Sequence, residues 1–102
     1  MPAKLDRHAL QLSALGNPVR LKILRFVVQA GADGSAAGEI QTHVDLPAST
    51  LSHHLKRLSN AGMLGVRVAG TFHFYTADYK QLRALTEYLW EDCCKRGSAD
   101  CC

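Results

Sequence analysis

The residues with the most distinctive chemistry are four cysteines, all within the last ten positions of the chain: Cys93, Cys94, Cys101 and Cys102. A disulfide framework would spread its cysteines through the fold, and a reducing compartment would not preserve such bridges. Thiolates are soft ligands, and a set made of sulfur alone, without histidine or carboxylate, argues against magnesium, calcium and copper(II). The cluster therefore predicts a site for a thiophilic ion.

Basic residues gather in two stretches that contain no acid. The first lies between Asp6 and Asp33 and the second between Asp45 and Asp78, although the net charge of the chain is only +3. Such a distribution favours a polyanion as the partner, with a solvated face that has no partner as the alternative.

Length and composition limit the class of protein. The chain has 102 residues, 47% of them hydrophobic and 21% charged, which suits one globular domain with a single core. The apolar runs are too short to span a membrane, and residues 1–11 contain no secretory signal. We therefore expect a cytoplasmic protein.

Helical spacing of apolar residues marks the first half of the chain. The pattern over residues 5–15 predicts a helix that ends at Gly16. Asn17 followed by Pro18 is typical of a helix start, because the Asn side chain caps backbone N–H groups and Pro lacks an N–H where none is needed. This second helix should close at Gly31, and a loop should separate it from a short helix over residues 38–44.

The next segment predicts a helix with one apolar and one polar face. Leu51, Leu55 and Leu58 share a face, and together with the preceding short helix the segment has the pattern of a helix-turn-helix. The second helix of this motif enters the major groove of DNA. His54 falls beside the leucines and is expected to be a packed structural residue. The residues expected to contact bases or phosphates are Ser49, Thr50, Ser52, His53, Lys56 and Arg57.

The second half of the chain ends in a hairpin and a last helix. Residues 64–68 and 72–76 alternate as strands do, and Arg67 is the best candidate for a DNA contact from this hairpin. Asp78 should cap a helix that continues into the first cysteine pair and ends at Gly97.

These elements predict a mainly α, α+β fold, a winged helix-turn-helix with a two-stranded wing. We expect one domain over residues 1–96, followed by a flexible cysteine-containing tail over residues 97–102. The terminal helices carry apolar stripes that one small domain cannot fully bury, which predicts a homodimer through the first and last helices. The expected interface residues are Leu5, Leu12, Leu82, Leu85 and Leu89.

Two segments resemble the ArsR/SmtB family of metal-responsive bacterial repressors. The segment ALGNPVRLKIL at residues 14–24 is similar to the family's second-helix signature, and STLSHHLKRL at residues 49–58, followed by Ala61 and Gly62, is similar to its recognition helix. The similarity extends from about residue 8 to residue 90. It implies a dimeric winged-helix repressor that binds operator DNA and leaves it when the inducer binds.

Departures from the family pattern narrow the range of possible inducers. Many arsenic and cadmium sensors of the family have a Cys-x-Cys pair before the recognition helix, where this chain has Ala36 and Gly38. The zinc sensors have Asp and His ligands on the last helix, but residues 79–90 contain no histidine. The cysteines at the end of the chain are similar instead to the arsenite-responsive subgroup whose ligands lie at the C-terminus.

Trivalent arsenic or antimony suits these cysteines, because it takes three sulfurs in a pyramid. Cys93 and Cys94 would supply two sulfurs. Cys101 follows Cys94 by seven positions, about 25 Å when extended, so either Cys101 or Cys102 can fold back as the third ligand. Zinc prefers four ligands in a tetrahedron, and adjacent cysteines fit its usual spacing poorly.

The sequence thus predicts a repressor induced by As(III) or Sb(III), without an organic cofactor and without enzymatic activity. A repressor that senses redox change or another thiophilic metal stays open as an alternative. A thiol enzyme or metal carrier is disfavoured, because the chain has no Cys-x-x-Cys motif and no glycine-rich phosphate loop.

Overall fold

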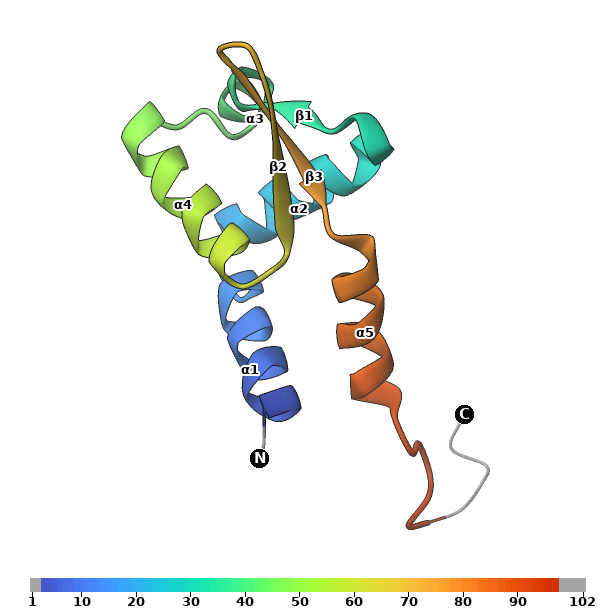
Figure 1. Ribbon diagram of the computed structural model, residues 1–102. Coiled ribbons are helices and arrows are strands. Elements are labelled where there is room, and N and C mark those ends of the chain that lie inside the picture. The colour runs from blue at the N-terminus through green and yellow to red at the C-terminus, as the bar shows by residue number, and fades with distance from the viewer. Residues whose placement is uncertain (1–2, 98–102) are drawn as a thin grey trace.

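The computed structural model describes residues 3–97 and places them in five α-helices, a short 3-10 turn and a three-stranded antiparallel sheet (Figure 1). This arrangement confirms the predicted winged helix-turn-helix. The elements are α1 (Ala3–Leu15), α2 (Pro18–Ala30), η1 (Gly31–Asp33), β1 (Ser35–Ala36), α3 (Ala37–Val44), α4 (Ala48–Asn60), β2 (Leu64–Ala69), β3 (Phe72–Ala77) and α5 (Tyr79–Trp90).

The predicted helix caps are present. The side chain of Asn17 accepts hydrogen bonds from the backbone N–H groups of Val19 and Arg20, at 3.0 and 3.1 Å. Asp78 accepts from the N–H of Gln81 at 3.0 Å. Each cap satisfies N–H groups that have no partner within the helix, which fixes where α2 and α5 begin.

The sheet has one strand more than predicted. The strands lie in the order β1-β3-β2, so the two-residue strand β1 pairs with β3 beside the hairpin. Gly34 makes this pairing possible, because its φ is +76° and a Cβ there would lie 2.5 Å from the Tyr75 carbonyl oxygen. The predicted loop over residues 32–37 is therefore in part a strand that anchors the wing to the domain.

The core lies between α2, α3, α4 and the base of the sheet. Leu51, Leu55 and Leu58 all point into it, as their spacing predicted. Ile23 and Ile40 bring α2 and α3 to the same cluster, and both are fully buried. This packing holds the helix-turn-helix rigidly, so its outer face is presented in one orientation.

Helices α1 and α5 extend from this core in the same direction, away from the tip of the wing (Figure 1). Helix α5 ends at Trp90, before the first cysteine pair, and the prediction that it continues to Gly97 is wrong. Among residues 3–97, no helix combines the length and the apolar character that crossing a bilayer requires.

Candidate nucleic-acid interface and cysteine site

The outer face of α4 is polar and open to solvent. It contains two serines, a threonine, a histidine and two basic residues, and no acid. All the α4 residues predicted to contact DNA lie on it: Ser49, Thr50, Ser52, His53, Lys56 and Arg57 are exposed. Their contacts with DNA stay a prediction, and the structure shows only that they share one accessible surface.

A buried arginine fixes α4 against α1 and α2. Arg20 is only 8% exposed, and its Nε donates a hydrogen bond to the Ala14 carbonyl at the end of α1 at 2.6 Å. Its Nη1 lies 3.3 Å from His54 Nδ1, in the middle of α4. One guanidinium thus joins three helices, and His54 is packed as expected.

The same contact sets the protonation of His54. Burial lowers the pKa of His54, and the charges of Arg20, His53 and Arg57 lower it further. A neutral ring can accept the Arg20 proton at Nδ1, which places its own N–H at Nε2. The lowered pKa thus favours the neutral ring of His54, which lies against Arg20 on α4.

Arg67 lies in the middle of β2, and contacts within the protomer hold its side chain. Its guanidinium carbon is 4.6 Å from the centre of the Phe74 ring, and Nη2 donates to the Asp33 carbonyl at 3.4 Å. Val66 and Val68 beside it are more than half exposed. The wing is thus largely apolar, and Arg67 is its charged residue.

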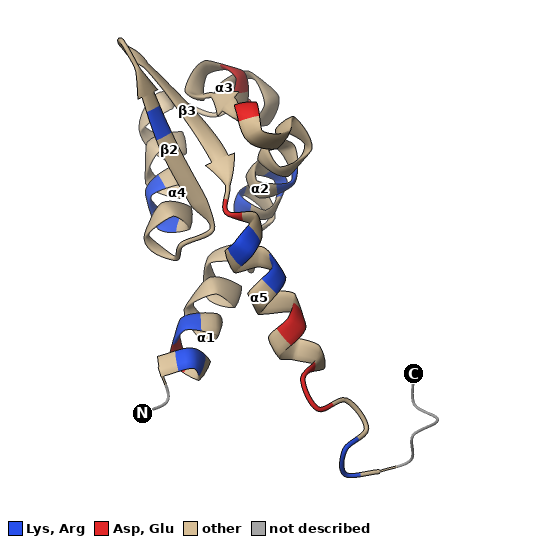
Figure 2. Cartoon of the chain, turned by 45° about the vertical axis from the view of Figure 1, so that its right-hand side comes forward, with Lys and Arg blue, Asp and Glu red and all other residues tan. Residues whose placement is uncertain are grey.

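The charges are unevenly distributed over the elements (Figure 2). Helices α2 and α4 and strand β2 contain lysine or arginine and no acid, α3 contains an acid and no lysine or arginine, and α1, α5 and the segment after α5 contain both signs. The second acid-free stretch of the sequence thus contains α4 and the wing, whereas α3 lies between the two stretches.

The first cysteine pair lies in a chain of tight turns after α5. Cys93 N–H donates to the Trp90 carbonyl at 2.9 Å, and Gly97 N–H donates to the Cys94 carbonyl at 3.2 Å. The helix is ended by Glu91, whose ψ is 132°, and the following Asp92 and Cys94 have positive φ values of 57° and 65°, a left-handed conformation. The Sγ atoms of Cys93 and Cys94 are 3.4 Å apart, and Cys93 is exposed.

The described residues contain only part of the predicted metal site. Cys101 and Cys102 lie outside residues 3–97. Within that range, no group of three or more His, Cys, Asp or Glu side chains is placed to hold a metal ion. The described part of the chain therefore supplies two neighbouring sulfurs.

A polar chain that the sequence analysis missed joins α1 to α5. His8 and Gln11 are 2% and 0% exposed, and His8 Nδ1 lies 2.8 Å from Gln11 Oε1. Gln11 Nε2 donates to Gln81 Oε1 at 3.0 Å, and the His8 ring packs on Tyr88 with centroids 4.6 Å apart. The sequence contained one signal of this chain: His8 and Gln11 are three residues apart and fall on the same face of α1 as the buried Ala14.

The contacts between α1 and the end of the chain's last helix continue to a residue close to the cysteines. Lys4 Nζ lies 2.8 Å from Glu91 Oε1, and this hydrogen bond with the Glu91 charge raises the pKa of Lys4. At the other end of α1, Gln11 lies close to Gly62, which follows the last residue of α4 by two positions. A Cβ added to Gly62 would be 3.9 Å from Gln11 Nε2. Helix α1 thus contacts both the segment after α5 and the end of the recognition helix.

The predicted interface residues divide into two groups. Leu5, Leu12 and Leu89 are 53%, 43% and 58% exposed, so they are free to contact a second protomer. Leu82 is half-buried against the core. Leu85 is only 3% exposed and belongs to the core, so the structure places it inside the protomer rather than at an interface.

Sequence comparison finds relatives among transcription regulators. Residues 15–67 match the family model of a helix-turn-helix domain. The chain is 28% identical over 101 residues to the arsenical resistance operon repressor of Bacillus subtilis (strain 168), covering 96% of this chain and 92% of that protein. It is 35% identical over 72 residues to an uncharacterized HTH-type transcriptional regulator of Methanocaldococcus jannaschii, covering 71% and 79%.

Solved structures with the same fold agree. HlyU from Vibrio cholerae N16961 matches with a TM-score of 0.73 and 28% identity, over 92% of this chain and 99% of that one. The homodimeric winged helix-turn-helix domain of a possible ArsR-family regulator from Mycobacterium bovis matches with a TM-score of 0.70 and 30% identity, over 88% and 83%. With its polar recognition helix and its wing, this chain belongs to the ArsR/SmtB family of winged helix-turn-helix transcriptional regulators.

Proposed function

We propose that this protein is a dimeric repressor that leaves its operator when trivalent arsenic or antimony binds Cys93, Cys94 and a third cysteine, either Cys101 or Cys102. The observation that carries the proposal is the pair of sulfur atoms 3.4 Å apart on the exposed turn after α5. The name of the Bacillus subtilis relative, an arsenical resistance operon repressor, supports the same inducer.

The geometry of the pair suits a shared soft ion. Two bonds of about 2.3 Å, the length of a metal–thiolate bond, that meet at roughly 90–100° hold their sulfurs about 3.3–3.5 Å apart. When bound, trivalent arsenic would take three sulfurs, and each thiol would give its proton to a hydroxyl that leaves as water. The observed sulfur separation of 3.4 Å is a contact distance between adjacent side chains, and two sulfurs this close could reach one ion in the reduced protein.

The DNA side of the proposal rests on α4 and on symmetry. Two copies of α4 related by a two-fold axis would read half-sites about one helical turn apart, or a multiple of it, in an imperfect palindrome. The exposed leucines of α1 and α5 are the apolar surface that such a dimer would bury, and the homodimeric Mycobacterium bovis structure supports this assembly.

Helix α1 offers a route between the two sites. Glu91 is two residues before Cys93 and is tied to Lys4, so a rearrangement of the cysteine turn would act on α1. The buried Gln11 donates to Gln81 and lies near Gly62, two residues after the end of α4. His8 and Gln11 are therefore positioning residues, which transmit a change at the cysteines without touching the ion or the DNA.

A second candidate signal is oxidation. Cys93 is exposed, so in the reduced protein a peroxide could oxidise its thiol to a sulfenic acid, releasing water, and the sulfenic acid would condense with a second thiol of the chain to a disulfide and water. In that case the protein would have the same DNA-binding surface and a different inducer.

One experiment separates these candidates. Operator binding by the reduced full-length protein is titrated in parallel with arsenite, cadmium, zinc and hydrogen peroxide. The proposal expects release at the lowest concentration with arsenite. Release by peroxide but not by arsenite would favour the redox sensor, and release first by cadmium or zinc would favour another thiophilic metal.

A further inference from the structure

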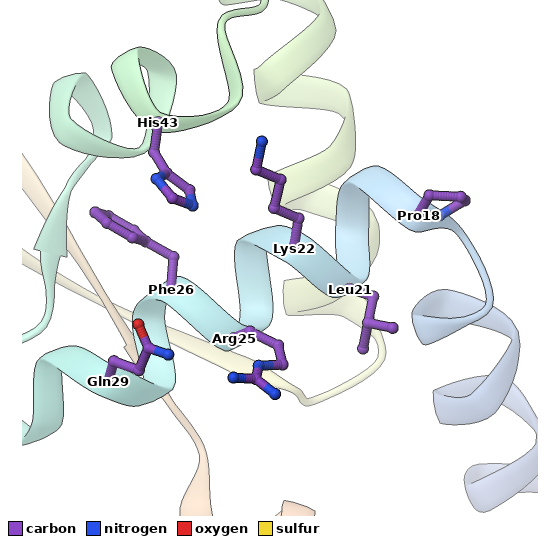
Figure 3. Close-up of a pocket in the computed structure, with 7 residues that line it drawn as sticks. All are labelled: Pro18, Leu21, Lys22, Arg25, Phe26, Gln29 and His43. Carbon is purple, nitrogen blue, oxygen red and sulfur yellow. The ribbon is translucent and has the colours of Figure 1, made fainter.

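A pocket on the opposite side of α2 from Arg20 has no part in the proposed function. It lies between α2 and α3 and has a volume of about 380 Å³, within the usual range for small-ligand sites (Figure 3). Its lining includes Leu21, Lys22, Phe26 and His43.

The lining of this pocket is cationic. Lys22 and Arg25 are both exposed at its walls, and no acid lines it. The ion pairs found within residues 3–97 join Lys4 to Glu91 and Lys95 to Asp92, and neither involves the pocket. Pro18, in the first turn of α2, also lines it, so the positive end of the helix adds to the field. An anionic group is the ligand chemistry that this surface favours.

The same pocket has a flat aromatic wall. The ring of Phe26 stacks on the ring of His43, with centroids 4.2 Å apart and planes 17° from parallel. Leu21 provides an apolar side, and the amide of Gln29 offers both a donor and an acceptor. A planar ring would pack against the stacked Phe26–His43 pair while an attached carboxylate reached the cations.

We propose that the α2–α3 pocket binds a small aromatic carboxylate, as a second ligand site independent of the cysteines. The carboxylate would lie between Lys22 and Arg25, whose side chains point apart and would turn inward to reach it, and the ring would lie against the Phe26–His43 pair (Figure 3). A bidentate contact with the Arg25 guanidinium would give the site its preference for a carboxylate over a neutral group.

Binding is tested on the reduced full-length protein by NMR amide shifts and calorimetry with benzoate as the probe. Acetate supplies the charge without the ring, and benzyl alcohol supplies the ring without the charge. We expect saturable shifts at Lys22, Phe26 and His43 with benzoate, and affinity lower by about tenfold or more for either control compound. Equal affinity for acetate and benzoate would overturn the proposal, because it would reveal only a general anion surface.

Matched variants locate the site and exclude a role in DNA binding. Arg25→Gln should weaken benzoate binding by about tenfold, as expected for loss of a hydrogen bond to a charged group, while Arg83→Gln on exposed α5 should not. The Lys22→Gln, Arg25→Gln double variant should keep its operator affinity and salt dependence. A salt slope reduced by about two in that variant would mean that these side chains contact DNA phosphates, and the proposal would be wrong.

Discussion

His54, in the middle of α4, contacts the buried guanidinium of Arg20. Arg20 lies 3.3 Å from its Nδ1, and burial and Arg20 together lower its pKa. The folded protein therefore binds fewer protons at His54 than the unfolded chain does. Its contribution to stability is complete above the ordinary histidine pKa of about 6.5 and is lost as the pH falls below that value toward the lower pKa of the folded state.

This linkage predicts a difference between the wild type and His54→Gln. Glutamine can still accept from Arg20 but does not titrate, so the variant should lose less of its melting temperature between pH 7.5 and pH 5.5. Thermal unfolding followed by circular dichroism at the two pH values measures this. Equal losses in both proteins would show that His54 does not titrate with folding.

The basic residues of the interface predict how binding responds to salt. Lys56→Ala on α4 should lower the slope of log affinity against log salt by about 0.9, as expected for the loss of one phosphate contact. Arg67→Ala should lower it by the same amount, if the guanidinium beside Phe74 also reaches a phosphate. Fluorescence anisotropy with operator DNA at several salt concentrations measures both slopes. An unchanged slope and affinity for Arg67→Ala would remove the wing from the DNA-binding surface.

At the scale of elements, buried polar contacts join α1 to α5, and packing between their leucine side chains does not. Gln11 is fully buried, and its amide contacts Gln81 while lying close to Gly62. Buried hydrogen bonds of this kind fix one arrangement of two helices, because losing a partner leaves a desolvated polar group. This makes α1 a rigid link between the cysteine turn and α4.

The link predicts a variant that binds both ligands but no longer couples them. Gln11→Leu should retain arsenite binding and operator affinity, while the typical coupling of about 1–3 kcal/mol between the two falls toward zero. The change also leaves Gln81 without its partner, so we expect a loss of about 1–3 kcal/mol in the free energy of unfolding. Operator titrations with and without arsenite measure the coupling.

Ser13→Ala, at an exposed position of the same helix, is the matched control and should behave as the wild type. If Gln11→Leu is released by arsenite as fully as the wild type, α1 does not carry the signal. A wild type that arsenite does not release would instead contradict the inducer itself.

Local signals in the sequence predicted most of these elements. Asn17 and Asp78 cap the helices they were expected to cap, because capping depends on a few neighbouring residues. Strand β1 was missed, since its two residues are held by β3, about forty positions later, and short-range patterns contain no trace of that pairing. The end of α5 at Trp90 was missed because the helix is broken at Glu91, whose ψ is 132°, although glutamate is a good helix former and carries no stop signal.

The candidate site was predictable to a similar degree. The polar face of α4 follows from helical spacing and was predicted residue by residue, whereas the burial of Leu85 was not. Leu82, Leu85 and Leu89 share one face of α5, at spacings of three and four residues, and only the packing against the rest of the fold decides which of them is covered.

For the whole molecule, the exposed leucines of α1 and α5 predict how the dimer can be disrupted. Leu89 is 58% exposed, so Leu89→Glu should leave the protomer folded but place a charge in the dimer interface. We expect a monomer in analytical ultracentrifugation and a large loss of operator affinity, because one half-site alone binds weakly. Val66→Glu on the wing, where Val66 is 53% exposed, is the control and should stay dimeric. A dimer of unchanged strength in Leu89→Glu would place the interface elsewhere.

The central claim is that the cysteines after α5 bind the inducer and control DNA binding by the whole dimer. Its most direct test is an arsenite titration of operator-bound wild type and of the Cys93→Ser, Cys94→Ser double variant under reducing conditions, followed by fluorescence anisotropy of the operator. The account predicts that both proteins bind the operator equally and that arsenite releases only the wild type. If arsenite releases the double variant as well, the inducer acts at another site and the account is contradicted.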